Sequence, residues 1–193
     1  GLESQVLTES VRQAARAKVS NFRLVKVPKK RDMAMKSDSA EALPAKSLVI
    51  ISSGGGGYPE LLEILPRLPG DPDACIVVLQ AMPRVFMAPV AEYLNERCLL
   101  RISPLKNHLP LARGRCHIGF GASDFPVTLE PDEGKTGFRF SIAPPSAGGN
   151  AFDRFLASAA DHLPDRVTVF LLSGAIPGSM KGIRRVREKR GRI

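Results

Sequence analysis

The stretch of the chain that most constrains its fold runs from Leu48 to Leu62. Four consecutive apolar residues, Leu48–Ile51, predict a β-strand that is buried on both faces. Four glycines follow at 54–57, and glycine permits backbone torsions and close approaches that other residues do not. Pro59 and the leucines after it predict a helix, because proline is favoured in the first helical turn. A strand, a glycine turn and a helix in this order predict an α/β sheet with its functional site at the carboxyl edge.

The composition indicates one globular domain with appendages. With 193 residues, of which 44% are hydrophobic and 24% are charged, the chain is long enough to bury one sizeable core. No uncharged apolar run approaches the roughly 18 residues needed to span a bilayer, and no apolar segment typical of a secretory signal follows the N-terminus. Cys75, Cys98 and Cys116 are scattered, which favours reduced thiols over a disulfide framework or a metal site. We therefore expect a cytoplasmic protein without membrane insertion.

The net charge of +9 comes largely from two basic clusters. The first lies between Arg23 and Lys36, and the second lies between Lys181 and Arg192. Basic clusters attract acidic partners or nucleic acid, although most charge runs are simply solvated surfaces. No aromatic side chain interleaves with either cluster and no nucleic-acid motif accompanies them, so nucleic acid is not the expected partner.

The residue pattern divides the chain into three parts. Residues 1–20 place apolar side chains at helical spacing and predict an amphipathic helix. Residues 21–46 shift towards charge, Ser and Pro without a sustained period, and predict a charged linker. Residues 47–193 form the predicted core domain.

Within this domain, apolar runs alternate with helical patterns, as in βαβ units. Three runs predict neighbouring central strands, namely Leu48–Ser52, Cys75–Gln80 and Val167–Leu172. Phe125–Leu129 and Phe138–Ile142 alternate in polarity around a Pro-Asp-Glu-Gly turn, which predicts an antiparallel hairpin. The expected fold class is α/β and Rossmann-like, with a doubly wound, mostly parallel sheet, helices on both faces and one antiparallel hairpin.

Several separated stretches of the core domain fall into one pattern, in the same order as in a known family. Ile51–Gly57 resembles the Gly-Ala-Ser-Thr-Gly-Gly turn of the CheB protein-glutamate methylesterases. Val78–Pro83 resembles that family's Val-Gln-His-Met-Pro loop, and Leu171–Gly182 resembles its Leu-Thr-Gly-Met-Gly-Asp-Asp-Gly segment. Gly114–Gly121 and Pro144–Ala160 are similar to two further stretches of the family. The resemblance covers nearly the whole core domain and implies a CheB methylesterase-like fold.

The family hydrolyses glutamyl methyl esters on chemoreceptors with a Ser-His-Asp triad, but the resemblance places none of these three side chains in this chain. The position of the nucleophile falls on Gly54, that of the histidine on Ala81, and that of the aspartate on Gly178. A slip of one residue would offer Ser53 as the nearest nucleophile. We therefore expect no intact triad.

A serine nucleophile also needs a base within about 2.6–3.2 Å, and the base needs an orienting acceptor. The chain has three histidines, His108, His117 and His162, and none lies in a loop that follows a predicted buried strand. His117 within a strand and His162 at a helix end are expected to have structural roles, and His108 lies in a Pro-flanked loop. Loss of one triad member costs about 10⁴–10⁶ in rate, so we expect a fold without its reaction.

Two other functions are compatible with the same residues. An active protein-glutamate methylesterase would use Ser53 with a base that the sequence does not identify. Alternatively, the glycine turn would hold a phosphate or another anion at the start of the following helix, although it lacks a Walker motif. The candidate binding residues around this turn are Ser52, Ser53, Gly55, Gly56, Gly57 and Met82. The sequence indicates neither a metal-ligand cluster nor a cofactor.

The resemblance also has implications for organisation and partners. Family members have a receiver domain before the esterase, joined by a helix and a charged linker, and residues 1–20 resemble the end of that arrangement. The domain is expected to be C-terminally short, either as part of a longer protein or as a shortened one. We expect a catalytically degenerate CheB methylesterase-like domain that acts as a binding or regulatory module in chemotaxis or two-component signalling. Its expected partner is a chemoreceptor or signalling protein, with a receiver domain in cis or trans.

Overall fold

The computed structural model describes residues 43–70, 72–120, 127–133, 136–142, 150–175 and 180–193. These residues form a five-stranded parallel sheet in the order β3-β4-β2-β1-β7 and a separate antiparallel pair of strands, β5 and β6. The strands are β1 (Ser47–Ser53), β2 (Ala74–Gln80), β3 (Arg101–Pro104), β4 (Arg115–Phe120), β5 (Val127–Pro131), β6 (Phe138–Ile142) and β7 (Val167–Leu171). The predicted fold class is confirmed.

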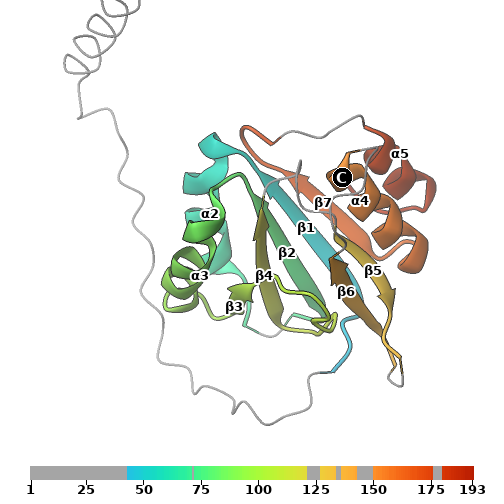
Figure 1. Ribbon diagram of the computed structural model, residues 1–193, viewed down its shortest axis with the longest axis horizontal. Coiled ribbons are helices and arrows are strands. Elements are labelled where there is room, and N and C mark those ends of the chain that lie inside the picture. The colour runs from blue at the N-terminus through green and yellow to red at the C-terminus, as the bar shows by residue number, and fades with distance from the viewer. Residues whose placement is uncertain (1–42, 71, 121–126, 134–135, 143–149, 176–179) are drawn as a thin grey trace, which may run out of the picture.

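Helices cover both faces of the sheet, and the hairpin shares one face with two of them (Figure 1). The helices are α2 (Tyr58–Ile64), α3 (Met87–Asn95), α4 (Ala151–His162) and α5 (Lys181–Glu188), with short 3₁₀ turns η2 (Gly55–Gly57), η3 (Leu65–Arg67) and η4 (Arg84–Phe86). One apolar core lies between the sheet and α2 and α3, and a second lies between the sheet and α4, α5 and the hairpin. Because β1 and β2 contribute to both cores, their sequences are apolar at successive positions rather than at alternate ones.

The helices α4 and α5 are joined by close backbone packing and one buried carboxylate. Asn150 caps α4, since its Oδ1 accepts hydrogen bonds from the backbone N–H groups of Phe152 and Asp153. Asp153 Oδ1 accepts a hydrogen bond of 2.8 Å from the backbone N–H of Gly182, in the first turn of α5. A Cβ atom at Gly182 would lie 2.7 Å from Asp153 Cα, so this crossing requires glycine. Asp153 therefore anchors the start of α5.

The prediction that Val167–Leu172 is a central strand is wrong. β7 (Val167–Leu171) is next to β1, as expected, but it is an outer strand among the described residues. The exposed fractions are 51% for Phe170 and 39% for Leu171. Within the described ranges, the only partner of β7 besides β1 is Arg192, whose backbone N–H and carbonyl form hydrogen bonds of 2.9 Å with this strand. An apolar run indicates burial in general, but it does not specify how many neighbours a strand has.

The predicted amphipathic helix at 1–20 and most of the predicted linker lie outside the described residues. The last residues of the predicted linker are part of the domain. Pro44 forms an antiparallel bridge with Ala112, and the backbone N–H of Ala45 donates to the carbonyl of Leu111 at 2.9 Å. Among the described residues, no helix is long and apolar enough to cross a membrane.

Candidate functional site

The carboxyl ends of β1, β2 and β7 bring together three loops that are distant in sequence. The backbone N–H of Ala81 donates to the carbonyl of Ser53 at 2.9 Å, which joins the loop after β2 to the end of β1. The backbone N–H of Gly54 donates to the carbonyl of Ser173 at 3.2 Å, which joins the glycine turn to the loop after β7. Gly54 and Ala81 are thus close together, as the resemblance implies, whereas Gly178 lies outside the described residues.

Gly54 has no space for a side chain. An ideal Cβ atom at this position would lie 2.6 Å from the Cα of Gly174 and closer still to the Gly174 carbonyl group. The backbone of Gly54 is extended, with φ −89° and ψ −170°, so any residue type would tolerate its torsions. A side chain at position 54 is therefore excluded by collision, because the backbone of the loop after β7 occupies the position of its Cβ atom.

Ser53 is enclosed beneath the glycine turn, with an exposed fraction of 2%. Among the described residues, its hydroxyl has one hydrogen-bond acceptor, the carbonyl of Gly54, at a long distance of 3.4 Å. A Cβ atom at Gly57 would collide with the Ser53 Oγ and would lie 2.8 Å from the carbonyl oxygen of Ser173, so the turn packs directly over the serine. Ser53 has no histidine among the partners recorded for the described residues.

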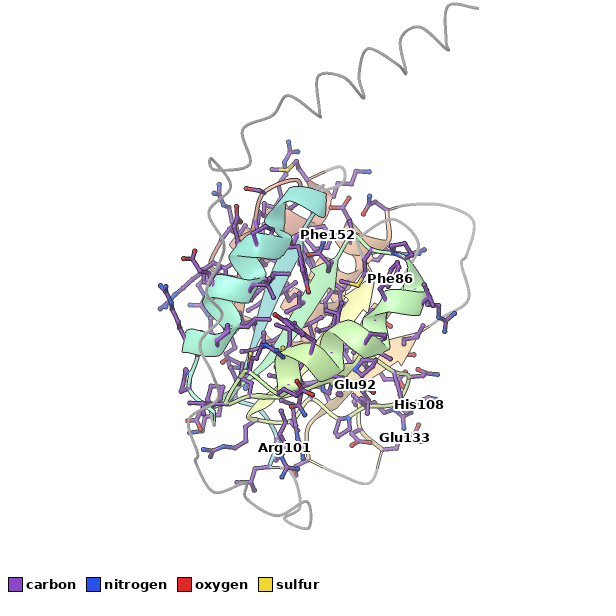
Figure 2. All side chains as sticks on the ribbon, turned by 90° about the vertical axis from the view of Figure 1, so that its left-hand side faces the viewer. Phe86, Glu92, Arg101, His108, Glu133 and Phe152 are labelled. Carbon is purple, nitrogen blue, oxygen red and sulfur yellow. The ribbon has the colours of Figure 1, made fainter. Side chains whose placement is uncertain are left out.

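The three histidines lie in other places. His162 Nδ1 is 2.9 Å from the carbonyl oxygen of Ser158 within α4, which fits the predicted structural role. His108 is exposed and its Nε2 is 3.1 Å from the Asn107 side-chain amide. Figure 2, which looks onto the face covered by α2 and α3, shows His108 well below Phe86, the residue that ends η4 and precedes α3. In the part of the chain that the structure describes, neither His162 nor His108 forms a hydrogen bond with a residue of the glycine turn.

His117 is the buried histidine of the domain, with an exposed fraction of 4%. Its Nδ1 is 3.0 Å from Ser103 Oγ, and its ring packs edge-on against Phe140. Its Nε2 is buried without a hydrogen-bond partner among the described residues. Only one of the two ring nitrogens therefore has the hydrogen bond that a structural role predicts. Burial, and to a smaller extent the charge of Arg115, lower the pKa of His117 to about 4. The neutral imidazole is therefore strongly favoured in the folded protein.

A serine–carboxylate pair, which the sequence did not indicate, holds the loop after β7 on the start of α2. The hydroxyl of Ser173 donates to Glu60 Oε1 in a short hydrogen bond, and the backbone N–H of Ser173 donates to Glu60 Oε2 at 3.2 Å. These side-chain and backbone hydrogen bonds lower the pKa of Glu60. A carboxylate with a lowered pKa is a weaker base, so the pair fastens the loop rather than activating the hydroxyl.

Gln80, at the end of β2, connects the glycine turn to the loop that follows β2. Its side-chain Nε2 donates to the carbonyl of Gly54 at 2.9 Å and to that of Ala81 at 3.3 Å. Gln80 is buried, and its Oε1 has no partner among the described residues. The amide therefore fixes the two positions at which the resemblance expects a nucleophile and a base.

The candidate binding residues do not form one accessible surface. Ser52, Ser53 and Gly57 are buried, whereas Gly55 and Gly56 are exposed and Met82 is half-buried. The backbone N–H of Gly57 donates to the carbonyl of Gly54 at 3.1 Å, so it is not available to an anion. Glu60 already places a negative charge in the first turn of α2. No group of three or more His, Cys, Asp or Glu residues that could hold a metal was found in the part of the chain that the structure describes.

Comparisons with known proteins identify one family. The family model of the CheB methylesterase matches residues 49–193. Protein-glutamate methylesterase/protein-glutamine glutaminase 1 of Bordetella avium is 30% identical over 167 residues, which are 82% of this chain and 44% of that protein. Protein-glutamate methylesterase/protein-glutamine glutaminase of Desulfotalea psychrophila is 24% identical over 156 residues, or 80% of this chain and 41% of that protein. The chain thus spans less than half the length of these two curated relatives.

A solved structure agrees with this assignment. The crystal structure of the Thermotoga maritima CheB methylesterase catalytic domain matches with a TM-score of 0.65 at 26% sequence identity. The match covers 75% of this chain and 76% of that chain.

Proposed function

The chain belongs to the CheB methylesterase family, and on that basis we propose that its domain has lost ester hydrolysis and acts as a binding or regulatory module in chemotaxis or two-component signalling. The observation that carries this proposal is the contact between Gly54 and the backbone of Gly174. A nucleophilic side chain has no place at Gly54 unless the loop after β7 moves.

The chemistry of the neighbouring residues supports the same proposal. Acyl transfer by a serine requires a base that accepts its proton and an acceptor that orients the base. Ala81 supplies neither group at the position that the resemblance assigns to the base, and no described histidine contacts the turn. The buried amide of Gln80 holds the loops in this arrangement.

The alternative of an active esterase that uses Ser53 has less support. The Ser53 hydroxyl is 2% exposed under the turn and would need both a base and a path for the substrate. The alternative of an anion sensor also has less support, because Glu60 places a carboxylate at the start of α2, where an anion would bind.

A protein partner follows from the family as part of the proposal. The curated relatives are named protein-glutamate methylesterase/protein-glutamine glutaminase, so a chemoreceptor or another signalling protein of the cytoplasm is the proposed partner, with a receiver domain in cis or trans. Val85 and Phe86 are exposed in η4, shortly after Ala81 in the chain. Exposed apolar side chains of this kind support a protein contact at η4.

Release of methanol from a peptide with a glutamyl methyl ester tests the loss of hydrolysis. We expect the 193-residue protein to give the rate of buffer alone, and we expect Ser53→Ala to leave that rate unchanged. An intact family member on the same peptide is the positive control. Turnover by the wild type that disappears in Ser53→Ala would contradict the proposal and would favour the esterase.

A further inference from the structure

The charge of the described residues is concentrated at the C-terminal helix. Residues 180–193 contain seven Lys or Arg side chains and one carboxylate, that of Glu188, whereas the remaining described residues contain eleven basic and eleven acidic side chains. The excess positive charge of the described part therefore lies on α5 and the residues that follow it. Five exposed members of this group, which we call the basic ridge, are Lys181, Arg184, Arg187, Arg190 and Arg192.

Among the described residues, the basic ridge differs from the adjacent Arg185 and Lys189 in having no ion pair. Arg185 pairs with Asp161 of α4 at 2.7 Å and with Glu188 at 3.3 Å, and Lys189 pairs with Asp161 at 3.4 Å. Among the described residues, no ion pair is found for any of the five side chains of the basic ridge. Acidic groups are therefore available to Arg185 and Lys189, while the ridge presents its charge to solvent.

The stability of α5 does not account for the ridge. Lys181 and Arg184 lie near the N-terminal end of the helix, where the helix dipole disfavours positive charge, and the first turn contains no acidic residue. Like charges three or four residues apart on one helix also repel each other. The opposite side of α5 supplies its attachment, since Ile183 and Val186 are buried in the core with α4. Lys181 and Arg184 are thus unfavourable for the helix and packing offsets their effect, whereas Arg187 lies in the last turn, where the dipole favours positive charge.

Hydrogen bonds before and after α5 hold the basic ridge in a fixed position on the domain. Asp153 fixes the start of α5 through the backbone N–H of Gly182, at 2.8 Å. Beyond the helix, the backbone N–H of Gly191 donates to the carbonyl of Val186 at 2.8 Å, and Arg192 pairs with β7 through two backbone hydrogen bonds of 2.9 Å. Binding to a preorganised array of charges loses less conformational entropy than binding to a flexible one.

We propose that the basic ridge binds an acidic segment of a protein partner. This inference deepens the proposed function, on which it rests, by assigning a surface and a charge to the partner. Met180 and Ile193 are exposed at the two ends of the ridge and give a protein segment apolar contacts beside the charged ones. The outward face of α5 has neither the aromatic side chains that stack on unpaired bases nor the apolar side chains that insert into a bilayer.

Fluorescence anisotropy with two synthetic helical peptides tests the proposal. One peptide has glutamate at every third or fourth position, and the other has glutamine at the same positions. We expect the 193-residue wild type to bind the glutamate peptide, more weakly as salt screens the charges, and not to bind the glutamine peptide. The double variant Arg184→Glu, Arg187→Glu should bind about tenfold more weakly or not at all.

The matched control is Arg67→Glu, Lys106→Glu, which changes the net charge by the same amount at exposed positions outside α5. We expect this control to bind within about twofold of the wild type, and circular dichroism checks that both variants are folded. No binding by the wild type, or equal losses in the two double variants, would overturn the proposal.

Tighter binding at 150 mM salt to a 20-base-pair DNA duplex, or to phosphatidylserine vesicles, than to the glutamate peptide would also overturn the assignment to a protein partner. These outcomes are distinguishable from failure of the proposed function, because methanol release from the ester peptide is measured separately and the ridge lies outside the glycine turn.

Discussion

Replacing Gly54 by alanine should destabilise the domain by about 3 kcal/mol, because the added methyl group has no space. Carbon atoms in contact are normally about 3.5–4.0 Å apart, whereas the new Cβ would lie 2.6 Å from Gly174 Cα. A shift of about 1 Å is therefore required from backbone, not from a flexible side chain. That backbone is held by Ser173, through the carbonyl that accepts from Gly54 and the hydroxyl that donates to Glu60. The loop can yield only by losing these hydrogen bonds.

Equilibrium urea unfolding followed by far-ultraviolet circular dichroism measures this effect, since the chain has no tryptophan for fluorescence. A loss of about 3 kcal/mol lowers the urea midpoint by about 1–3 M for a domain of this size. The matched control is Gly55→Ala, because a Cβ atom at Gly55 meets nothing within 4 Å. We expect the control to stay within about 1 kcal/mol of the wild type. Equal midpoints for Gly54→Ala and the wild type would refute the steric argument.

Two other perturbations test the buried histidine and the surroundings of the positions that the resemblance assigns to the triad. The pKa of His117 is about 4 in the folded protein and about 6.5 in the unfolded chain. As the pH falls, the unfolded chain therefore binds the proton first, and the free energy of unfolding decreases between pH 6.5 and 4. Between pH 7.5 and 4.5 the decrease in the free energy of unfolding should be about 2.5 kcal/mol larger in the wild type than in His117→Leu. Urea unfolding measures both decreases, and equal decreases in the two proteins would contradict this prediction. The triple variant Gly54→Ser, Ala81→His, Gly178→Asp should not reach the turnover of an intact family member, because the first substitution displaces the loop after β7. Equal single-turnover rates on one ester peptide would show that the surrounding structure is intact.

Much of the fold could be predicted from local sequence. Leu48–Ile51 and Cys75–Leu79 are apolar without interruption because strands β1 and β2 contribute to both cores. The alternation in β5 and β6 predicted the hairpin for a related reason, since only one face of these strands is buried. The outer position of β7 could not be predicted in this way, because strand order depends on pairing between distant segments.

The proximity of Gly54 and Ala81 could be predicted from the sequence, but the contacts around them could not. The order of motifs identified Gly54 and Ala81, and the structure brings these two residues together at the carboxyl edge. The contact of Gly54 with Gly174 and the pair formed by Glu60 and Ser173 join residues more than 110 positions apart. Such contacts depend on the course of the loop after β7, for which the sequence offers no periodic pattern. Glu60 in the first turn of α2 had a sufficient local explanation as a favourable charge at a helix start.

Covalent labelling by a fluorophosphonate tests the central claim most directly, because it detects an activated serine whatever the natural substrate is. The measurement is the intact mass of the 193-residue protein after incubation with the reagent, beside an intact CheB family member. We predict no mass increase, since Ser53 is buried under the glycine turn and Ser173 donates its hydroxyl to Glu60, whose lowered pKa makes its carboxylate a weak base. A single adduct that maps to Ser53, Ser52 or Ser173, formed as fast as in the family member, would contradict the account.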